Sequence, residues 1–304
     1  VRFAAQGLWG VCAQVSMARY FHADRGKAAA VSTAGYALGF AIFPLIGAWL
    51  LMTFGWREAW AFSAWFVILV ILPLTMFQLW GHGKRHLAYE EKLAGLIDEK
   101  TGTKVRQWAL KEVLSDVRFW FLQPAMLAVP AIIFSIQFHQ LYLIESRGWA
   151  LTAFAGGYTV YSVVSLLAIL ITGSMIDRYG SYKLVILYLC PLVPALLVLA
   201  FVSSAIAIPI FMALTGVTFG MSLVVFMTVW AEMYGTKNMG AIRSFNIFLN
   251  VSFASLVMVL TGWLIDGGVS IEVMCLGGVG VVALSLISTT VARRMPEPHR
   301  ASVS

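Results

Sequence analysis

The chain has 304 residues, of which 60% are hydrophobic and 12% charged, with a formal net charge of +7. A soluble globule of this length needs far more polar surface, so the composition excludes one and predicts an integral membrane protein. Cys12, Cys190 and Cys275 each lie in an apolar run without metal-ligand or disulfide spacing, and are interpreted as small buried hydrophobes.

Nine apolar segments are long enough, at about 20 helical residues each, to cross a hydrocarbon core of about 30 Å. They are too long for membrane β-strands, and helices are the other way to satisfy the backbone in lipid. The sequence therefore predicts an all-α integral membrane protein. The segments lie near 1–21, 28–54, 58–80, 119–144, 151–175, 183–203, 205–233, 240–265 and 270–292.

The one long polar interval divides these segments into two groups. We expect a three-helix part at 1–80, a cytoplasmic linker at 81–118, a six-helix part at 119–292 and a cytoplasmic tail at 293–304. The interval mixes both charge signs with some helical periodicity, which favours a solvated linker with short amphipathic helices. Because Val1 already lies in an apolar segment, we expect that an N-terminal part precedes it.

Basic residues predict the orientation. If the first span ends inside, the inner connections hold the linker cations together with Arg178, Lys183, Lys237 and Arg243, whereas the outer connections hold only Arg57 and Arg147, with Arg2 near the outer end of the first span. This asymmetry follows the positive-inside rule and explains the net charge without a nucleic-acid partner. We expect the linker and the C-terminus to be cytoplasmic, and contact with membrane lipid.

Two junctions indicate an internal repeat. Residues 19–39 and 232–252 share an aromatic residue, a short basic loop, a glycine and a helix rich in small residues. The helices that they open also end alike, in GAWLLMTFG and TGWLIDGG. Two copies of one helix pair, on either side of a polar linker, are typical of a transporter built of two similar halves.

The charged stretch GSMIDRYGSYK, at 173–183, resembles the loop signature of the major facilitator superfamily. Gly173, Asp177, Arg178, Gly180 and Lys183 fall on that pattern, whereas Ser181 and Tyr182 stand where the family usually has basic residues. VRFAAQGLWG, FHADRGKAAAVSTAGYALG and GWRE also look typical of bacterial members. The resemblance implies a helical bundle of twelve membrane helices, of which about nine are present and the first three absent.

The loop has a physical interpretation of its own. Asp177 is predicted at the cytoplasmic end of one helix and just before the next, where a carboxylate can accept hydrogen bonds from exposed backbone N–H groups and meet a helix's positive end. Contacts made in one conformation and broken in another would form a latch between outward-open and inward-open states. An ordinary loop that only sets topology is compatible with the same charges; the two glycines favour the latch.

Residues 34–50 indicate close helix packing, because Gly35 and Gly39 form a small-residue face and Pro44 with Gly47 permits a kink. The segment resembles a degenerate form of the family's fifth-helix motif associated with antiporters, with Phe43 in place of a glycine. Packing is therefore the favoured interpretation.

Polar residues in apolar spans are candidates for the transport path, because they are costly in lipid. Each has an alternative. Hydroxyls often bond to a carbonyl one turn earlier, Gln137, His139 and Gln140 suit headgroup depth, and Asn pairs suit hydrogen bonds between helices. The family resemblance implies that the first, fourth and seventh spans line the cavity. The candidates are Arg2, Gln6, Gln14, Gln123, Gln137, His139, Gln140, Tyr158, Tyr161, Ser165, Thr215, Thr218, Ser222, Asn246 and Asn250.

We expect a secondary transporter of the inner membrane that moves a small-molecule substrate, with possible coupling to protons, by alternating access. No nucleotide-binding loop is present in the sequence, and the histidines are scattered, so neither a cofactor, nor a metal site, nor an enzyme is expected. The alternative is a receptor or scaffold with the transporter fold but without transport.

Overall fold

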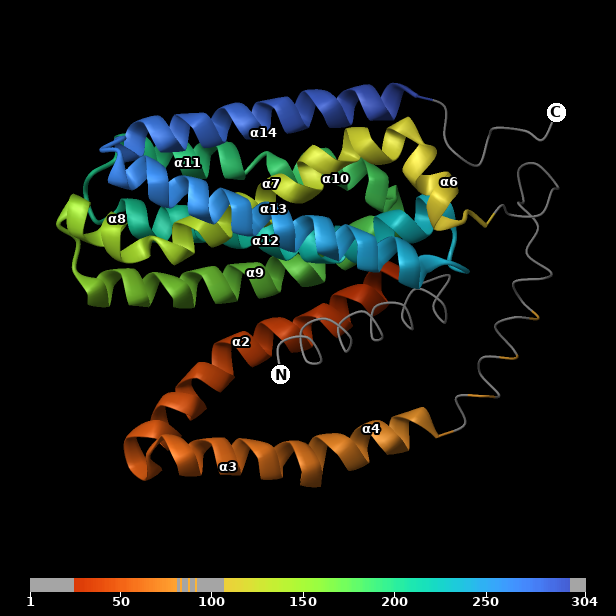
Figure 1. Ribbon diagram of the computed structural model, residues 1–304, viewed down its shortest axis with the longest axis horizontal. Helices are drawn as coiled ribbons and strands as arrows, with labels where there is room; N and C mark the ends of the chain where they lie inside the picture. Colours follow the sequence, from red (N-terminus) through yellow and green to blue (C-terminus); the bar gives the residue numbers. More distant parts are fainter. Residues whose placement is uncertain (1–24, 81–82, 84–86, 88–90, 92–106, 296–304) are drawn as a thin grey trace. The chain divides into compact units, whose positions relative to one another are not determined.

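The computed structural model describes residues 25–80, 83, 87, 91 and 107–295, and all regular structure in these residues is helical (Figure 1). Their contacts divide them into two compact units. One comprises the first turns of α2, as far as Gly35, together with 107–295, and the other begins at Tyr36.

The second unit contains the rest of α2 (Arg25–Phe54) and one long helix made of α3 (Trp56–Phe66), η2 (Val67–Ile71) and α4 (Leu72–Leu79). The two helices meet at Gly55, whose φ of 85° is the left-handed conformation that glycine adopts without steric cost. The π-helical turn η2 ends two residues before Pro73, which has no N–H to donate to a preceding carbonyl.

The C-terminal bundle, α6 to α14, belongs to the first unit. Its short helices are α6 (Leu110–Ser115) and α8 (Gln140–Arg147). One span is interrupted at Cys190 and Pro191, which separate its two halves α10 and α11. The long helices lie lengthwise beside one another in Figure 1. The spanning helices are α7 (Val117–Phe138), α9 (Leu151–Tyr179), α10 (Ser181–Leu189), α11 (Leu192–Phe201), α12 (Ala207–Tyr234), α13 (Met239–Asp266) and α14 (Ile271–Arg294).

The predicted all-α membrane architecture is confirmed. Seven helices among the described residues are long and apolar enough to cross a membrane, and they coincide with the predicted segments from 58–80 onward. Helix α2 occupies the predicted segment 28–54, whereas segment 1–21 lies outside the described residues. The segment predicted at 119–144 is broken at His139, after which α8 continues.

Helices α9 and α12 cross at very short range because α12 carries glycines where they meet. A Cβ atom on Gly216 would lie 2.8 Å from the carbonyl oxygen of Tyr161, and one on Gly220 would overlap the carbonyl of Ser165. The spacing of these glycines, four residues apart, is the one that allows helix backbones to approach closely in membranes. Gly216 and Gly220 were not among the glycines predicted to pack.

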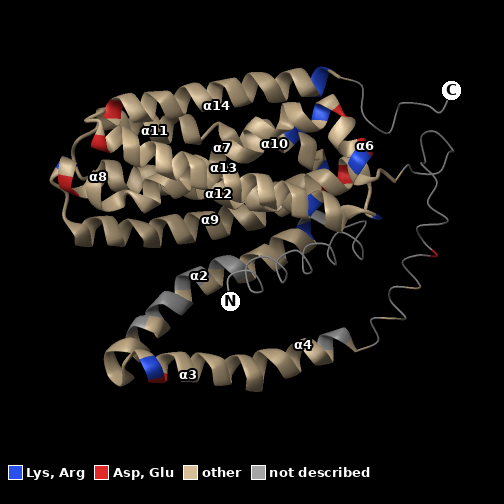
Figure 2. Cartoon of the chain, viewed as in Figure 1, with Lys and Arg blue, Asp and Glu red and all other residues tan. Residues whose placement is uncertain are grey.

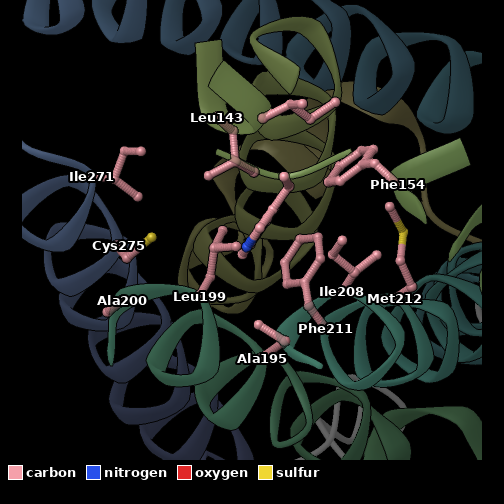
Figure 3. Packing of buried hydrophobic residues seen from close by; sticks show 13 residues of the cluster. Leu143, Phe154, Ala195, Leu199, Ala200, Ile208, Phe211, Met212, Ile271 and Cys275 are labelled. Carbon is pink, nitrogen blue, oxygen red and sulfur yellow. The ribbon is translucent and has the colours of Figure 1, made fainter. Parts of the chain in front are cut away.

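An apolar cluster closes the end of the bundle where α8, α9, α11, α12 and α14 meet. Figure 3 shows Leu143, Phe154, Leu199 and Phe211 converging from different helices. Trp149, beside them, donates from its indole nitrogen to the carbonyl oxygen of Ser203 at 2.7 Å. This packing joins the connection after α8 to the end of α11.

Charged residues of the bundle gather at its two ends (Figure 2). One end holds Asp177, Lys183 and Arg293, and the other holds Arg147 and Glu272. Arg147 and Glu272 form an ion pair of 2.8 Å. The stretches between the ends are apolar and partly exposed, as at Leu284 and Ile287 on α14, which suits helices that face lipid.

The end of the predicted linker docks on the bundle. The Oε1 atom of Gln107 accepts hydrogen bonds from the backbone N–H groups of Thr236 and Lys237, at 3.0 and 3.1 Å. Trp108 is buried, and its N–H donates to the carbonyl of Tyr234. Residues 107–115, predicted as solvated linker, therefore cover the turn between α12 and α13, because this turn exposes backbone donors that need acceptors.

Candidate functional site

Three side-chain amides form a chain between α7 and α13. Asn250 Nδ2 donates to Asn246 Oδ1 at 3.1 Å and to the backbone carbonyl of Asn246 at 2.9 Å. Asn246 Nδ2 donates in turn to Gln123 Oε1 at 3.2 Å. A backbone carbonyl can only accept, so the bond from Asn250 to the backbone carbonyl of Asn246 fixes which end of the Asn250 amide is the nitrogen. The bonds that follow then determine the orientation of the other two amides.

The chain leaves one donor and one acceptor unsatisfied. Gln123 Nε2 and Asn250 Oδ1 are buried without a hydrogen-bond partner in the described part of the protein. Leaving such a group unpaired costs about 1–3 kcal/mol, so buried polar atoms of this kind in a membrane span indicate a functional site. Gln123 lies about 9 Å along α7 from Val117, at 1.5 Å per residue.

Arg243 lies one turn before Asn246 and corrects the sequence analysis, which assigned it to a cytoplasmic loop. It is inside α13, with 5% of its surface exposed, and its Nη1 atom donates to the carbonyl of Phe226 on α12 at 2.6 Å. The loop prediction failed because basic residues near a span end are counted as loop residues. The spacing of three residues from Asn246 places both on one helix face and was the available signal.

Other pathway candidates are engaged locally. The hydroxyls of Thr215 and Ser222 donate to the carbonyls of Phe211 and Phe219 within their own helix, which is the structural alternative considered above. Tyr158 donates to Gln140 Oε1 at 2.8 Å, between α9 and α8.

The remaining candidates divide by location. Thr218 is fully buried with an unpartnered hydroxyl among the described residues. Tyr161 and Ser165 lie at the crossing of α9 with α12, and Gln137 and His139 lie at the C-terminal end of α7. Arg2, Gln6 and Gln14 fall outside the described residues.

The stretch 173–183, predicted as a loop, is helical except at Gly180, because α9 continues to Tyr179 and α10 begins at Ser181. Asp177 lies in the last turn of α9, at the predicted helix end, and its carboxylate accepts a backbone hydrogen bond as expected. Asp177 Oδ2 accepts a hydrogen bond of 3.1 Å from the backbone N–H of Lys27, in the first turn of α2. This N–H is one of the donors that a helix leaves unsatisfied at its start, where a negative charge is also favoured by the helix dipole. The guanidinium of Arg178 lies over the ring of Tyr179, 5.3 Å from its centre, and Lys183 is exposed.

The same stretch has a second carboxylate contact. Glu232 Oε2, near the end of α12, accepts from the backbone N–H of Ser181 at 2.9 Å and from its hydroxyl at 2.6 Å. Gly180 precedes Ser181 with a φ of 82°, a conformation that other residues rarely adopt. Ser181, where the resembling family has a basic residue, thus provides a specific partner for Glu232, and Gly173 is buried in α9.

The predicted packing role of the glycines in α2 remains a prediction. Among the described residues, nothing lies within 4 Å of a Cβ atom placed on Gly35 or Gly47. Gly39 is half-buried, and the side chain of Pro44 lies outside the described set.

Comparison with known proteins identifies the chain's family. A search of curated proteins finds no match. A family model described as Major Facilitator Superfamily matches residues 3–252, which include the charged stretch and all three residues of the amide chain. The chain therefore belongs to the major facilitator superfamily, a family of multi-pass membrane transporters that are not enzymes.

Proposed function

We propose that the protein is a secondary active transporter that moves a small polar solute across the inner membrane by alternating access. The observation that carries this proposal is the amide chain of Gln123, Asn246 and Asn250, which has an unsatisfied donor and an unsatisfied acceptor at membrane depth. A solute with hydroxyl or amide groups would satisfy both atoms and offset the cost of leaving them unpaired.

Asp177 would control the conformational change. Its carboxylate accepts a hydrogen bond from the start of α2, a helix of the predicted three-helix part of the chain. This contact would act as the latch predicted from the sequence by stabilising the conformation in which it forms over one in which it is broken. Arg178 and Lys183 lie beside it at the basic end of the bundle, which we propose to be cytoplasmic.

The driving force would be an ion or solute gradient, and protons are the first coupling ion to examine. The test uses the full-length protein in liposomes. Uptake of radiolabelled polyols, amino acids and nucleosides is measured with and without an imposed pH gradient, and by exchange against unlabelled solute. Gradient-driven uptake or exchange of one class supports the transporter.

Asn250→Leu provides the site-specific arm of this experiment. It removes the unsatisfied acceptor but keeps the bond between Asn246 and Gln123, and we expect at least a tenfold loss of uptake. Thr290→Val is the matched control, because Thr290 is exposed on α14 and its hydroxyl bonds only to the carbonyl of Leu286 in the described structure. Folded protein that neither accumulates nor exchanges any solute would contradict the proposal and favour a receptor or scaffold.

A further inference from the structure

The C-terminal bundle contains an apolar pocket of about 500 Å³ that is separate from the amide chain. It is bounded by α7, α8, α11, α13 and α14, and none of the three amides lines it. Its volume is within the range of about 300–1,000 Å³ that small-molecule sites occupy. The walls are mostly hydrocarbon, as at Ile136, Leu199 and Met274.

The pocket lies between two helices that diverge. Helices α13 and α14 both pack against α7 but hardly touch each other. Leu260 and Leu264 of α13 and Val273 and Val281 of α14 line the pocket and are also exposed. Both helices are long and apolar enough to cross a membrane, so a molecule dissolved in the hydrocarbon would reach the pocket between them.

One polar atom in the pocket wall is available to a ligand. His139 Nδ1 lies 3.0 Å from the carbonyl oxygen of Ser135, which can only accept, so Nδ1 carries the proton. The opposite ring nitrogen, Nε2, is then an acceptor in the neutral ring, and it has no hydrogen-bond partner in the described part of the chain.

The hydroxyls of Ser135 and Thr261, which also lie in the wall, are engaged by protein contacts. Ser135 donates to the Thr261 hydroxyl at 2.8 Å, and Thr261 donates to the carbonyl of Val257 at 2.8 Å. Tyr142 and Cys275 also line the pocket, and Tyr142 packs against the apolar cluster. The pocket therefore presents mostly hydrocarbon, with Nε2 of His139 as an acceptor directed by the bond at Nδ1.

We propose that this pocket binds a hydrocarbon-rich small molecule with one hydroxyl donor, a phenol or an alcohol, that donates to Nε2 of His139. A lipid acyl chain would fill the apolar walls but has no donor for this nitrogen. His139 lies about 12 Å along α8 from Arg147, so the donor of a lipid headgroup at the charged rim would not reach it. His139, a transport-path candidate in the sequence, is thus assigned to a site that none of the three amides lines.

Cys275 lines the pocket and provides a reporter. In protein with Cys12 and Cys190 changed to serine, in lipid nanodiscs, the rate of alkylation of Cys275 by N-ethylmaleimide is measured against increasing 4-octylphenol or 4-octylanisole. The two probes have the same apolar body, but only the phenol has a donor. We expect the phenol to protect Cys275 at roughly three- to tenfold lower concentration than the ether.

Variants separate the hydrogen bond from the apolar contacts. His139→Phe should remove the difference between the two probes. Gly262→Ala should do the same without changing His139, because its new methyl group would lie 3.4 Å from Nε2. His139→Gln, which keeps an acceptor, should retain part of the difference.

A matched pair of glycines tests the location. Gly277 lines the pocket and has open space around its Cβ position, so Gly277→Leu should weaken protection by both probes. Gly280 on the same helix is equally open but does not line the pocket, and Gly280→Leu should leave protection unchanged. Equal protection by phenol and ether in the unchanged protein would overturn the proposal. The proposal would also be overturned if neither probe protected Cys275 while lipid alone slowed its alkylation. That result would assign the pocket to an acyl chain.

Discussion

Replacing Gly216 by alanine tests whether the glycines of α12 hold it against α9. The added Cβ atom would lie 2.8 Å from the carbonyl oxygen of Tyr161, whereas ordinary contacts begin near 3.4 Å. The difference, 3.4 minus 2.8, requires a separation of about 0.6 Å between two helix backbones. Neither backbone can relieve the overlap by rotating a side chain.

The cost follows from the loss of packing along the crossing. A gap of 0.5–1 Å removes a quarter to a half of the dispersion energy of each affected contact, and overpacking in well-packed cores costs about 1–3 kcal/mol. Alanine also favours a helix by up to about 1 kcal/mol over glycine. Gly280→Ala, at an open position on α14, isolates this second effect.

The assay is thermal unfolding of both variants in one detergent, followed by circular dichroism. We expect Gly216→Ala to unfold at a lower temperature than the unchanged protein, and Gly280→Ala to unfold at the same or a higher temperature. If the two variants unfolded alike, the close approach of α9 and α12 would contribute nothing to stability, and the argument from Gly216 would be refuted.

Three other predictions address the charged stretch, the docked linker and the topology. Asp177→Asn keeps a hydrogen-bond acceptor but removes the negative charge at the start of α2. It should slow transport roughly fivefold, a change of about 1 kcal/mol, with little effect on equilibrium solute binding. Normal uptake by this variant would reduce the stretch to a topological role. Gln107→Ala leaves two backbone donors of the turn between α12 and α13 without their acceptor, and should lower the free energy of unfolding by about 1–3 kcal/mol. Lys111→Ala, at an exposed position, should not lower it. Equal free energies of unfolding for the two variants would contradict the docking of Gln107. Cysteine at Gly148 should react with an impermeant maleimide from outside intact cells and cysteine at Lys237 only after permeabilisation, and the reverse pattern would invert the orientation.

The sequence predicted the helices well because membrane spans are determined by local composition. Runs of apolar residues located the spans from 58–80 onward without knowledge of any contact. Breaks within a span were harder to predict. The helix interruption at His139 and the π-helical turn at Val67–Ile71 depend on which backbone carbonyl accepts each N–H, and composition does not reveal this choice.

The candidate site was predicted as separate residues but not as a network. Gln123 and Asn246 were selected because amides are costly in lipid, yet their hydrogen bond joins residues 123 positions apart, which no local pattern reveals. The Asp177 carboxylate was expected to accept from a backbone N–H, but its partner Lys27 lies 150 positions away. Arg243 was counted with an inner connection although it falls within the predicted segment 240–265, and its bond to the carbonyl of Phe226 joins two helices that no local pattern relates.

The common direction of the three amides makes them a single cooperative element. Asn250 is anchored by a backbone carbonyl that only accepts. The amide nitrogen of Asn250 then points toward the oxygen of Asn246, and the nitrogen of Asn246 points toward the oxygen of Gln123. Rotating Asn246 alone by 180° about its last torsion would oppose two nitrogens on one side and two oxygens on the other. A solute that turned the Gln123 amide around would therefore break its bond with Asn246, and substitutions at two of these positions should show strongly non-additive effects on transport.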